Sequence, residues 1–249
     1  MEKQRFIEKI ALVTGGANGL GRGMTEQLVR EGAQVIVFDI EDDTMEEVYA
    51  DNERVYCMHC DVRDYGQVQE SVAKVIEEFG HIDVLMNNAG ITHRQPFLEC
   101  SQEGWLDVMD TNLNGVFYVG QAVARTMVDK GIKGYIVNTS SNSARKTIGG
   151  ITPYGPSKAA VSMLTQVIAL ELAKYDIHVN AVAPGTSKTR ITEGTRFDPE
   201  RNAAFLAKMP FGRYGEIEEM VSVALFLASD DASFITGETI YEEGGFSLL

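Results

Sequence analysis

The sequence predicts an α/β fold with three layers, in which helices cover both faces of a doubly wound parallel sheet. Short apolar runs alternate along the chain with longer amphipathic stretches. The short runs are apolar at successive positions, as expected for parallel strands that are buried on both faces. No internal repeat and no Pro/Ser-rich linker divides the 249 residues, so we expect a single domain over residues 1–249.

The individual elements follow from these patterns in chain order. The apolar runs predict strands at 9–15, 33–39, 54–61, 83–90, 135–141 and 177–185, with a short last strand near 239–241. Amphipathic stretches predict helices at 23–32, 67–80, 105–128 and 154–174. The least regular stretch, 186–215, is expected to form a flap over the substrate or a surface excursion. In such a fold ligands bind beyond the carboxyl ends of the strands.

The composition excludes several classes of partner. Lys and Arg number 22 and Asp and Glu number 36, which gives a formal net charge of −14. A chain this acidic lacks the basic face that binds nucleic acid or an anionic membrane. No apolar run approaches the ~20 residues that span a bilayer, and the charged start, MEKQRFIEK, is unlike a signal peptide. We therefore expect a cytoplasmic protein with no nucleic-acid or membrane partner.

The chain has three cysteines, of which Cys57 and Cys60 form a C-x-x-C pair at the end of a predicted strand. A metal site needs further ligands, and a redox pair usually lies at the start of a helix. We favour buried, unreactive thiols and expect no metal. A metal or redox role is the alternative.

A glycine-rich loop joins the first predicted strand to the first helix. Its sequence is TGGANGLG at 14–21, and Gly15, Gly19 and Gly21 allow a tight turn and a close approach to a pyrophosphate. Asp39 ends the next strand, 18 residues after Gly21. A carboxylate there binds ribose hydroxyls and repels a 2′-phosphate, so NAD is favoured over NADP. Arg22 is expected to point along the helix. The alternative is a glycine cluster beside an ordinary surface Asp.

Two further motifs follow strands on the ligand side of the sheet. Asp61-Val62 comes after the third strand, where Asp61 could bond the adenine amino group. Asn87-Asn88-Ala89-Gly90 comes after the fourth, where residues 88–90 could pack against ribose and stabilise the centre of the sheet. Taken singly, each motif is also explained as a turn or a helix cap.

The candidate reacting groups lie in the second half of the chain. Ser141 follows the fifth strand, and Tyr154 and Lys158 are four residues apart, on one face of a helix. The unperturbed tyrosine pKa of ~10 makes a poor base at neutral pH, but a nearby ammonium group lowers it. Tyr154 could then exchange a proton with an alcohol or ketone while hydride moves to or from a nicotinamide. Ser141 could hold the same substrate oxygen in line.

In this order, the motifs resemble those of the short-chain dehydrogenase/reductase family over essentially the whole chain. The resemblance is carried by TGGANGLG (14–21), Asp61-Val62, NNAG (87–90), Asn112 in NLNGVF, Ser141, YGPSK (154–158), Asn180 and PGTSKT (184–189). It implies a Rossmann-type oxidoreductase whose catalytic set is Asn112, Ser141, Tyr154 and Lys158. Asn112 would hold a water that links Lys158 to a proton relay.

The resemblance also implies where the cofactor binds. Ser187 and Thr189 would contact the nicotinamide carboxamide. The complete predicted cofactor set is Gly15, Asn18, Gly19, Leu20, Gly21, Asp39, Asp61, Val62, Asn88, Ala89, Gly90, Tyr154, Lys158, Pro184, Gly185, Ser187 and Thr189.

The chain departs from the family pattern near this end. Lys188 and Ser187 replace the usual residues before Thr189, and Glu242-Glu243 precedes Gly244-Gly245 where the family commonly has Asp-Gly-Gly. We expect the second change to leave the reaction untouched and to affect subunit packing.

The family is usually tetrameric or dimeric through its two long helices, so we expect a homotetramer or homodimer. Apolar residues of these helices are consistent with that, although some of them must pack on the sheet: Val108, Val116, Val119, Val123, Val161, Leu164 and Ile168.

The substrate pocket should be built from residues after Gly90, after Ser141 and from the flap. The main candidates are His93, Arg94, Ser143 and Arg190, with Gln95, Asn142, Arg145 and Arg196 as further ones. Residues 186–213 contain six basic residues and three acidic ones. This local excess of positive charge favours a polyhydroxylated or anionic substrate. The competing interpretation is a solvated flap whose cations pair with acidic neighbours.

The predicted function is therefore hydride transfer between NAD and a secondary alcohol such as a sugar or polyol. A carbonyl or 3-oxoacyl reductase is the alternative, although Asp39 disfavours the NADP that reductive biosynthesis generally uses. A non-catalytic dinucleotide sensor would be expected to lack Ser141, Tyr154 or Lys158, and all three are present. A lyase or epimerase on this fold is a further alternative.

Overall fold

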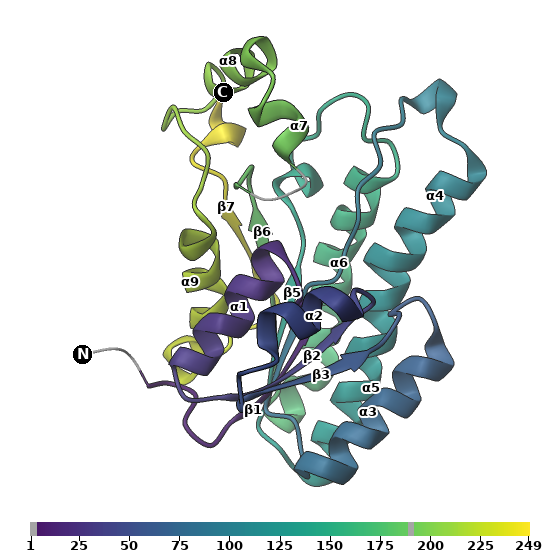
Figure 1. Cartoon of the computed structure of the whole chain (residues 1–249), viewed down its shortest axis with the longest axis vertical. Helices are drawn as coiled ribbons and strands as arrows, with labels where there is room; N and C mark the ends of the chain where they lie inside the picture. Colours follow the sequence, from purple (N-terminus) through teal and green to yellow (C-terminus); the bar gives the residue numbers. More distant parts are fainter. Residues whose placement is uncertain (1–3, 189–191) are drawn as a thin grey trace.

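A parallel sheet forms the centre of the molecule, as predicted. The computed structural model describes residues 4–188 and 192–249, in which a 7-stranded sheet has the order β3-β2-β1-β4-β5-β6-β7 (Figure 1). The strands are β1 (Ile10–Thr14), β2 (Gln34–Asp39), β3 (Val55–His59), β4 (Val84–Asn87), β5 (Tyr135–Thr139), β6 (His178–Pro184) and β7 (Thr239–Glu242). The order runs outward from β1 to β3 and from β4 to β7, so the chain changes direction between β1 and β4. This switch point is where ligands bind in doubly wound sheets.

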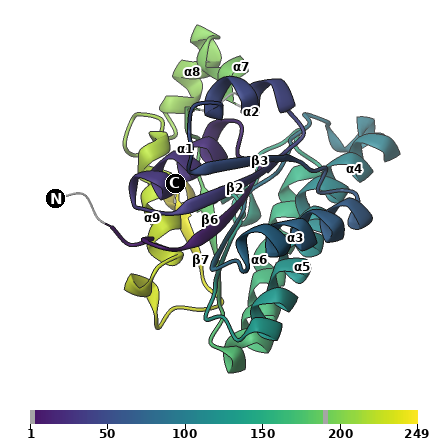
Figure 2. The same ribbon diagram turned by 60° about the horizontal axis from the view of Figure 1, so that its bottom comes forward.

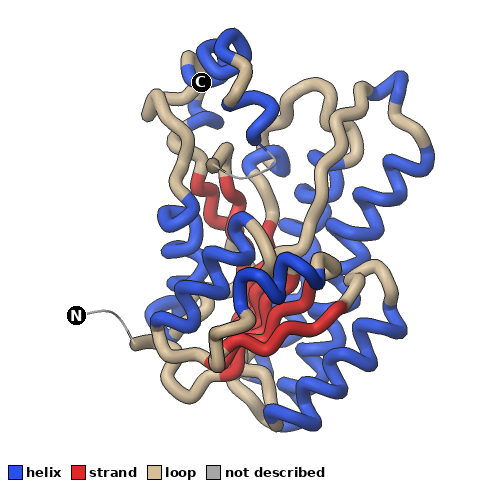
Figure 3. Tube along the Cα trace, in the orientation of Figure 1, coloured by secondary structure: helices blue, strands red, loops and turns tan. Residues whose placement is uncertain are grey.

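Helices lie on both faces of the sheet (Figures 2 and 3). One side carries α1 (Gly19–Arg30), α2 (Asp42–Tyr49) and α9 (Ile217–Leu227). The other carries α3 (Tyr65–Phe79), α4 (Gln102–Met109), α5 (Gly115–Lys130) and α6 (Tyr154–Leu172). Two short helices, α7 (Glu193–Arg196) and α8 (Pro199–Leu206), lie at the end where β6 and β7 finish.

Alternate residues of the strands pack into two separate hydrophobic cores, one on each face of the sheet. Val35 and Val37 of β2 pack with α1 and α9, whereas Ile36 and Phe38 pack with α3 and α5. All four side chains are fully buried. Because the central strands are apolar on both faces, the sheet has to be covered on both sides, which is the physical basis of the three layers.

The predicted helix at 105–128 is not continuous. A π-helical segment, Asp110–Asn114, separates α4 from α5. Within it, Asn114 Nδ2 donates to the Asp110 carboxylate at 2.7 Å and Thr111 Oγ1 donates to the Asp107 carbonyl at 2.9 Å. The segment is mostly polar and its buried residues are Thr111 and Asn112, so the apolar spacing that predicted the helix carries no information about its local geometry. It places Asn112, a predicted catalytic residue, in the irregular turn, a feature that often marks functional sites.

Two helices, α2 and α9, were not predicted from the sequence. A capping box was available as a signal for α9, because the side chains of Glu216 and Glu219 accept from each other's backbone amides. The stretch 186–215 is partly ordered, since it contains α7 and α8. Asp198 caps α8 by accepting from the amides of Glu200 and Arg201.

The long helices expose a different apolar set from the one predicted to face another subunit. Among the predicted residues, Val108, Val116, Val119, Val123 and Val161 are buried within the chain itself. The exposed apolar residues of α5 and α6 are Phe117, Met163, Val167 and Leu170. Within the described residues, no helix has both the length and the apolar character that crossing a bilayer requires.

Candidate active site

The glycine-rich loop is fixed to the neighbouring strand end by Asn88. The Asn88 side-chain amide donates to the carbonyls of Thr14 and Gly15 at 3.2 and 3.3 Å. Thr14 Oγ1 accepts in turn from the amides of Asn88 and Ala89 at 2.9 and 3.0 Å. Thr139 of β5 also donates to the Asn88 side chain. These bonds join three strand ends at the switch point, as the sequence predicted for the centre of the sheet.

The turn itself needs glycine. A Cβ atom on Gly21 would lie 2.0 Å from the Gly15 carbonyl oxygen, and Gly15 has a φ of +66°. The loop leads into α1, which has no side-chain cap and no acidic residue in its first turn. The positive end of a 12-residue helix is thus left available to an anion. Gly19, Leu20 and Gly21 lie in this first turn, so a pyrophosphate fits the residues present.

Acidic groups stand beside the loop where an adenosine ribose is expected. Asp39 accepts from the amide of Ala17 at 2.9 Å, and Glu41 accepts from the Asn18 side chain at 2.9 Å. Arg22 points along α1 as predicted, since its Nε donates to Glu26 at 2.7 Å. These carboxylates are the charged groups that a bound adenosine ribose would meet.

Asp61 is held by a neighbouring guanidinium. Arg63 Nη2 donates to Asp61 Oδ2 at 2.7 Å, and this pairing holds the pKa of the Asp61 carboxyl below its ordinary value. Val62 is buried against the helix behind it, because a Cβ on Gly115 would approach Val62 to 2.7 Å. The carboxylate that is predicted to meet adenine is therefore already engaged.

The structure brings Ser141, Tyr154 and Lys158 together. The Lys158 ammonium lies 5.9 Å from the centroid of the Tyr154 ring and donates to the Thr139 carbonyl at 2.7 Å. Ser141 lies two residues beyond that carbonyl and forms a side-chain hydrogen bond with Tyr154. A Cβ on Gly90 would lie 3.2 Å from the Lys158 nitrogen. The lack of a side chain at Gly90 leaves room beside the ammonium.

The pKa of the Tyr154 phenol differs from the prediction. Burial raises the pKa of the Tyr154 phenol, and the hydrogen bond with Ser141 only partly opposes the rise. Burial also lowers the pKa of Lys158 to about 8. The predicted lowering of the phenol pKa is therefore wrong for this structure, because burial is the largest effect on Tyr154 and the hydrogen bond with Ser141 is the smaller, opposing one. Tyr154 carries its proton at neutral pH, which is the form that can donate to a ketone oxygen.

Asn112 acts on the backbone of the loop after β4. Its side-chain oxygen accepts from the Ile91 amide at 2.8 Å, and its nitrogen donates to the Ile91 carbonyl at 2.9 Å and to Ser157 Oγ at 3.1 Å. Every side-chain polar atom of this buried residue is thus engaged with protein. The predicted water contact would need the Asn112 backbone, and that role stays a prediction.

The remaining predicted cofactor residues lie after β6. Pro184 ends the strand, the Gly185 amide donates to the Glu242 carbonyl at 2.9 Å, and Ser187 pairs with Gly215. Ser187 is buried. Two predicted residues, Thr189 and Arg190, lie outside the described residues.

The predicted substrate residues are dispersed around this end of the sheet. His93 pairs with Asp107 at 2.7 Å, and Arg94 donates to Thr195 of α7 at 3.4 Å. The Ser143 amide donates to Ser141 Oγ at 3.1 Å. The further candidates have structural partners: Gln95 bridges to Ile151, Asn142 accepts from Ser141, Arg145 lies over the Tyr241 ring, and Arg196 pairs with Glu193.

Known proteins share this architecture. The family model described as enoyl-(acyl carrier protein) reductase matches residues 15–247. A 2-dehydro-3-deoxy-D-gluconate 5-dehydrogenase from Dickeya dadantii is 37% identical over 240 residues, which cover 96% of this chain and 95% of the relative. A 3-oxoacyl-(acyl-carrier-protein) reductase from Thermotoga maritima is 40% identical over 248 residues, with coverages of 98% and 100%.

A solved structure is similar to this chain over almost its whole length. The crystal structure of a gluconate 5-dehydrogenase from Burkholderia cenocepacia, in complex with NADP and tartrate, matches with a TM-score of 0.94 at 31% identity. The match covers 100% of this chain and 98% of that one. The chain belongs to the short-chain dehydrogenase/reductase family. It is therefore an oxidoreductase that acts on CH–OH groups.

The local positive charge of the flap is largely neutralised in this dehydrogenase/reductase. Ion pairs join Lys188 to Glu216, Arg201 to Asp198 and Arg213 to Glu219. Two of the acidic partners, Glu216 and Glu219, lie just beyond residues 186–213, whose excess of positive charge favoured an anionic substrate. For these cations the interpretation as a solvated flap is confirmed, so they do not argue for an anionic substrate.

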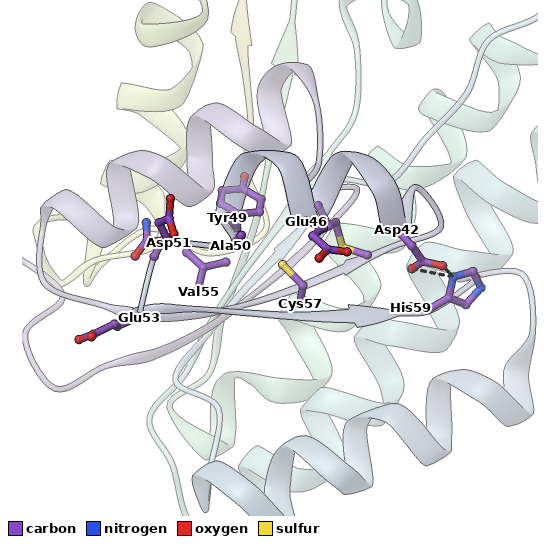
Figure 4. A pocket seen from close by; sticks show the side chains of 11 residues that line it. Asp42, Glu46, Tyr49, Ala50, Asp51, Glu53, Val55, Cys57 and His59 are labelled. Atoms are coloured by element: carbon purple, nitrogen blue, oxygen red, sulfur yellow. Dashed lines mark hydrogen bonds and ion pairs between the residues drawn. The ribbon is translucent and has the colours of Figure 1, made fainter.

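A groove lies at the edge of the sheet between α2 and β3, where Cys57 and His59 face the helix (Figure 4). His59 pairs with Asp42 at 2.9 Å. Burial raises the pKa of the thiols of Cys57 and Cys60 to about 11, so both are held in the unreactive protonated form. The sequence predicted buried, unreactive thiols: Cys60 is buried, whereas Cys57 is half-buried, and the raised pKa makes both unreactive. Tyr49 of the same groove donates to the Gly16 carbonyl at 2.7 Å and braces the glycine-rich loop from behind.

Glu242 is a half-buried acid at the end of β7, in register with Pro184 of β6. Both carboxyl oxygens are buried and lack a hydrogen-bond partner, as far as the described parts of the chain show. Burial raises the pKa of Glu242 to about 8. The adjacent Glu243 accepts from the Ser247 amide at 3.1 Å and so fixes the C-terminal segment.

The raised pKa predicts that stability falls as the pH rises. Between an ordinary pKa of 4.5 and a folded pKa of about 8, folded Glu242 holds a proton that the unfolded chain has released. The free energy of unfolding should decrease through this window, by at most about 1.4 kcal/mol per pH unit, and level off above it. Thermal unfolding of Glu242→Gln should lack this decline, whereas the exposed control Glu238→Gln should retain it. Parallel stability curves for wild type and Glu242→Gln would contradict the assignment.

Proposed function

We propose that this enzyme transfers hydride between NAD and a secondary alcohol of a polyhydroxylated compound, such as a sugar, a polyol or a sugar acid. The observation that carries the proposal is the convergence of Ser141, Tyr154 and Lys158 beside Gly90 at the switch point of the sheet. The dinucleotide would be held by the glycine-rich loop and the free end of α1. When bound, its nicotinamide supplies or accepts the hydride.

In this proposal Tyr154 moves the proton at the substrate oxygen. In reduction its phenol donates the proton to the ketone, and in oxidation the phenolate takes it from the alcohol. Ser141 hydrogen-bonds the same oxygen and fixes its direction. In oxidation the Lys158 ammonium, 5.9 Å from the Tyr154 ring, would be the positive charge that stabilises the phenolate against the effect of burial. Asn112 maintains the loop from which substrate residues project.

The preference for NAD rests on the charges beside the ribose position. Asp39 and Glu41 both lie against the glycine-rich loop, and Arg22 is engaged by Glu26. The solved gluconate 5-dehydrogenase binds NADP, so the family accommodates either dinucleotide. Here two carboxylates would face the additional phosphate of NADP.

The substrate class rests on polar side chains at the mouth of the site and on the relatives. His93, Arg94 and Ser143 offer hydrogen-bonding groups suited to hydroxyls or a carboxylate. Several relatives are named for sugar-acid substrates, including gluconate. The alternative, a 3-oxoacyl reductase, is favoured by the relative at 40% identity. A screen of polyols, sugar acids and 3-oxoacyl thioesters with both dinucleotides separates the two.

A cytoplasmic location stays a prediction from the sequence.

The proton-transfer role predicts that Tyr154→Phe loses activity while cofactor binding survives. The turnover rate should fall by about 10²-fold or more, the usual contribution of a positioned acid–base group. NADH affinity, measured by fluorescence titration, should change little because the ring remains. The exposed Tyr175→Phe is the matched control and should be fully active. Wild-type turnover in Tyr154→Phe would exclude the role. A wild type that binds NADH but turns over no alcohol or ketone would point to the sensor alternative.

The cofactor preference predicts a gain of NADP use in Asp39→Ala. Removing this carboxylate should raise the ratio of kcat/KM for NADP over NAD by about tenfold or more, because repulsion of the 2′-phosphate is relieved. Asp43→Ala removes an equal charge from an exposed position of α2 and should leave the ratio unchanged. Equal ratios in wild type and Asp39→Ala would contradict the assignment of Asp39.

A homotetramer or homodimer predicts that the exposed apolar face of α5 and α6 is covered in solution. Leu170, at 84% exposed, and Met163 belong to this face. Leu170→Glu should shift the protein to a smaller species in sedimentation velocity, because burying a carboxylate there opposes association. Ile7→Glu, at an exposed site near the N-terminus, is the control. A wild type that sediments as a monomer would contradict this proposal.

A further inference from the structure

A chain of charged side chains connects the predicted adenine residue to the loop that carries His93. Arg63 lies in the turn between β3 and α3. Its Nε donates to both oxygens of Asp61 at 3.0 Å, and its Nη2 donates to Asp61 Oδ2 at 2.7 Å. The remaining arm, Nη1, donates to Asp107 Oδ1 of α4 at 2.9 Å. The other oxygen of Asp107 pairs with Nε2 of His93 at 2.7 Å. One guanidinium thus spans two carboxylates, and the second carboxylate holds the imidazole.

The middle of the loop between β4 and α4 is held in place by this series of charged side chains. Asn112 fixes the Ile91 backbone at one end, and Gln95 pairs with Ile151 at the other. Between these anchors His93 is secured through Asp107, while Arg94 makes a longer bond of 3.4 Å to Thr195. The position of the imidazole is therefore set by the orientation of the Asp107 carboxylate.

We propose that Arg63 is a positioning residue that couples dinucleotide binding at Asp61 to the placement of His93 at the substrate site. This inference rests on the proposed function. Both Asp61 oxygens already accept from Arg63, including a bond from its backbone amide at 2.9 Å. A donor arriving at Asp61 must share these oxygens with the guanidinium.

The rigid geometry of the Arg63 guanidinium transmits a change at Asp61 to Asp107. Its five N–H donors are fixed in one plane, so a shift at Asp61 changes the bond to Asp107. The Asp107 carboxylate then reorients His93, and by linkage any constraint on His93 acts back on Asp61. Lysine keeps the charge but has a single ammonium nitrogen, which cannot span two carboxylates in this way.

The test uses ADP-ribose, which reaches the adenosine end and has no nicotinamide to complete the reacting site. Hydrogen–deuterium exchange of residues 91–96 is measured with and without saturating ADP-ribose. Binding is followed independently by isothermal titration calorimetry, which does not depend on a signal from α4. The variants are Arg63→Lys and Asp107→Asn. Arg54→Lys is the control, an exposed arginine bonded to the Gly32 carbonyl just before β3 begins.

In wild type and Arg54→Lys we expect ADP-ribose to slow exchange of 91–96 by about fivefold, the scale of a modest coupling between sites. In Arg63→Lys and Asp107→Asn ADP-ribose should bind but produce no slowing. Equal slowing in Arg63→Lys, or none in a saturated wild type, would overturn the inference and leave the proposed function intact. A wild type that fails to bind ADP-ribose would overturn the proposed function as well.

Discussion

One buried ammonium group organises the reacting end of the molecule. Lys158 is 3% exposed and donates to the carbonyl of Thr139, the last residue of β5. A charge taken out of water needs a partner, and this bond ties the first turns of α6 to the end of the strand. Ser141 lies two residues beyond the strand, and Tyr154 lies one helical turn before the lysine. The bond that satisfies Lys158 therefore also brings the serine and the phenol together.

The cofactor-binding end is likewise held by side chains that hydrogen-bond to backbone groups. Asn88 and Thr14 exchange hydrogen bonds across the switch point, and Tyr49 supports the glycine-rich loop from the opposite side. The loop can then present the uncapped start of α1 to an anion without being held by an acidic side chain of its own helix. The two ends meet at Gly90, which has no side chain to fill the space beside Lys158.

The fold and most of this site could be predicted because they rest on local patterns. Apolar runs determined the strands, and the loop 14–21 and the spacing of Tyr154 and Lys158 marked the chemistry. The π-helical turn at Asn112 was not predicted, because its buried residues, Thr111 and Asn112, are polar and apolar spacing says nothing about them. The raised phenol pKa was missed because burial by distant segments decides it. The pairing of Arg63 with Asp107, 44 residues later, likewise depends on tertiary packing that spacing does not encode.

The most direct measurement of the central claim is a crystal structure of the enzyme with NAD and a bound alcohol substrate or its unreactive analogue. We expect the reacting oxygen to lie within hydrogen-bonding distance of both the Tyr154 phenol and Ser141 Oγ, with its carbon facing the nicotinamide. A complex in which the reacting oxygen contacts neither side chain, or in which the dinucleotide lies away from the glycine-rich loop, would contradict it.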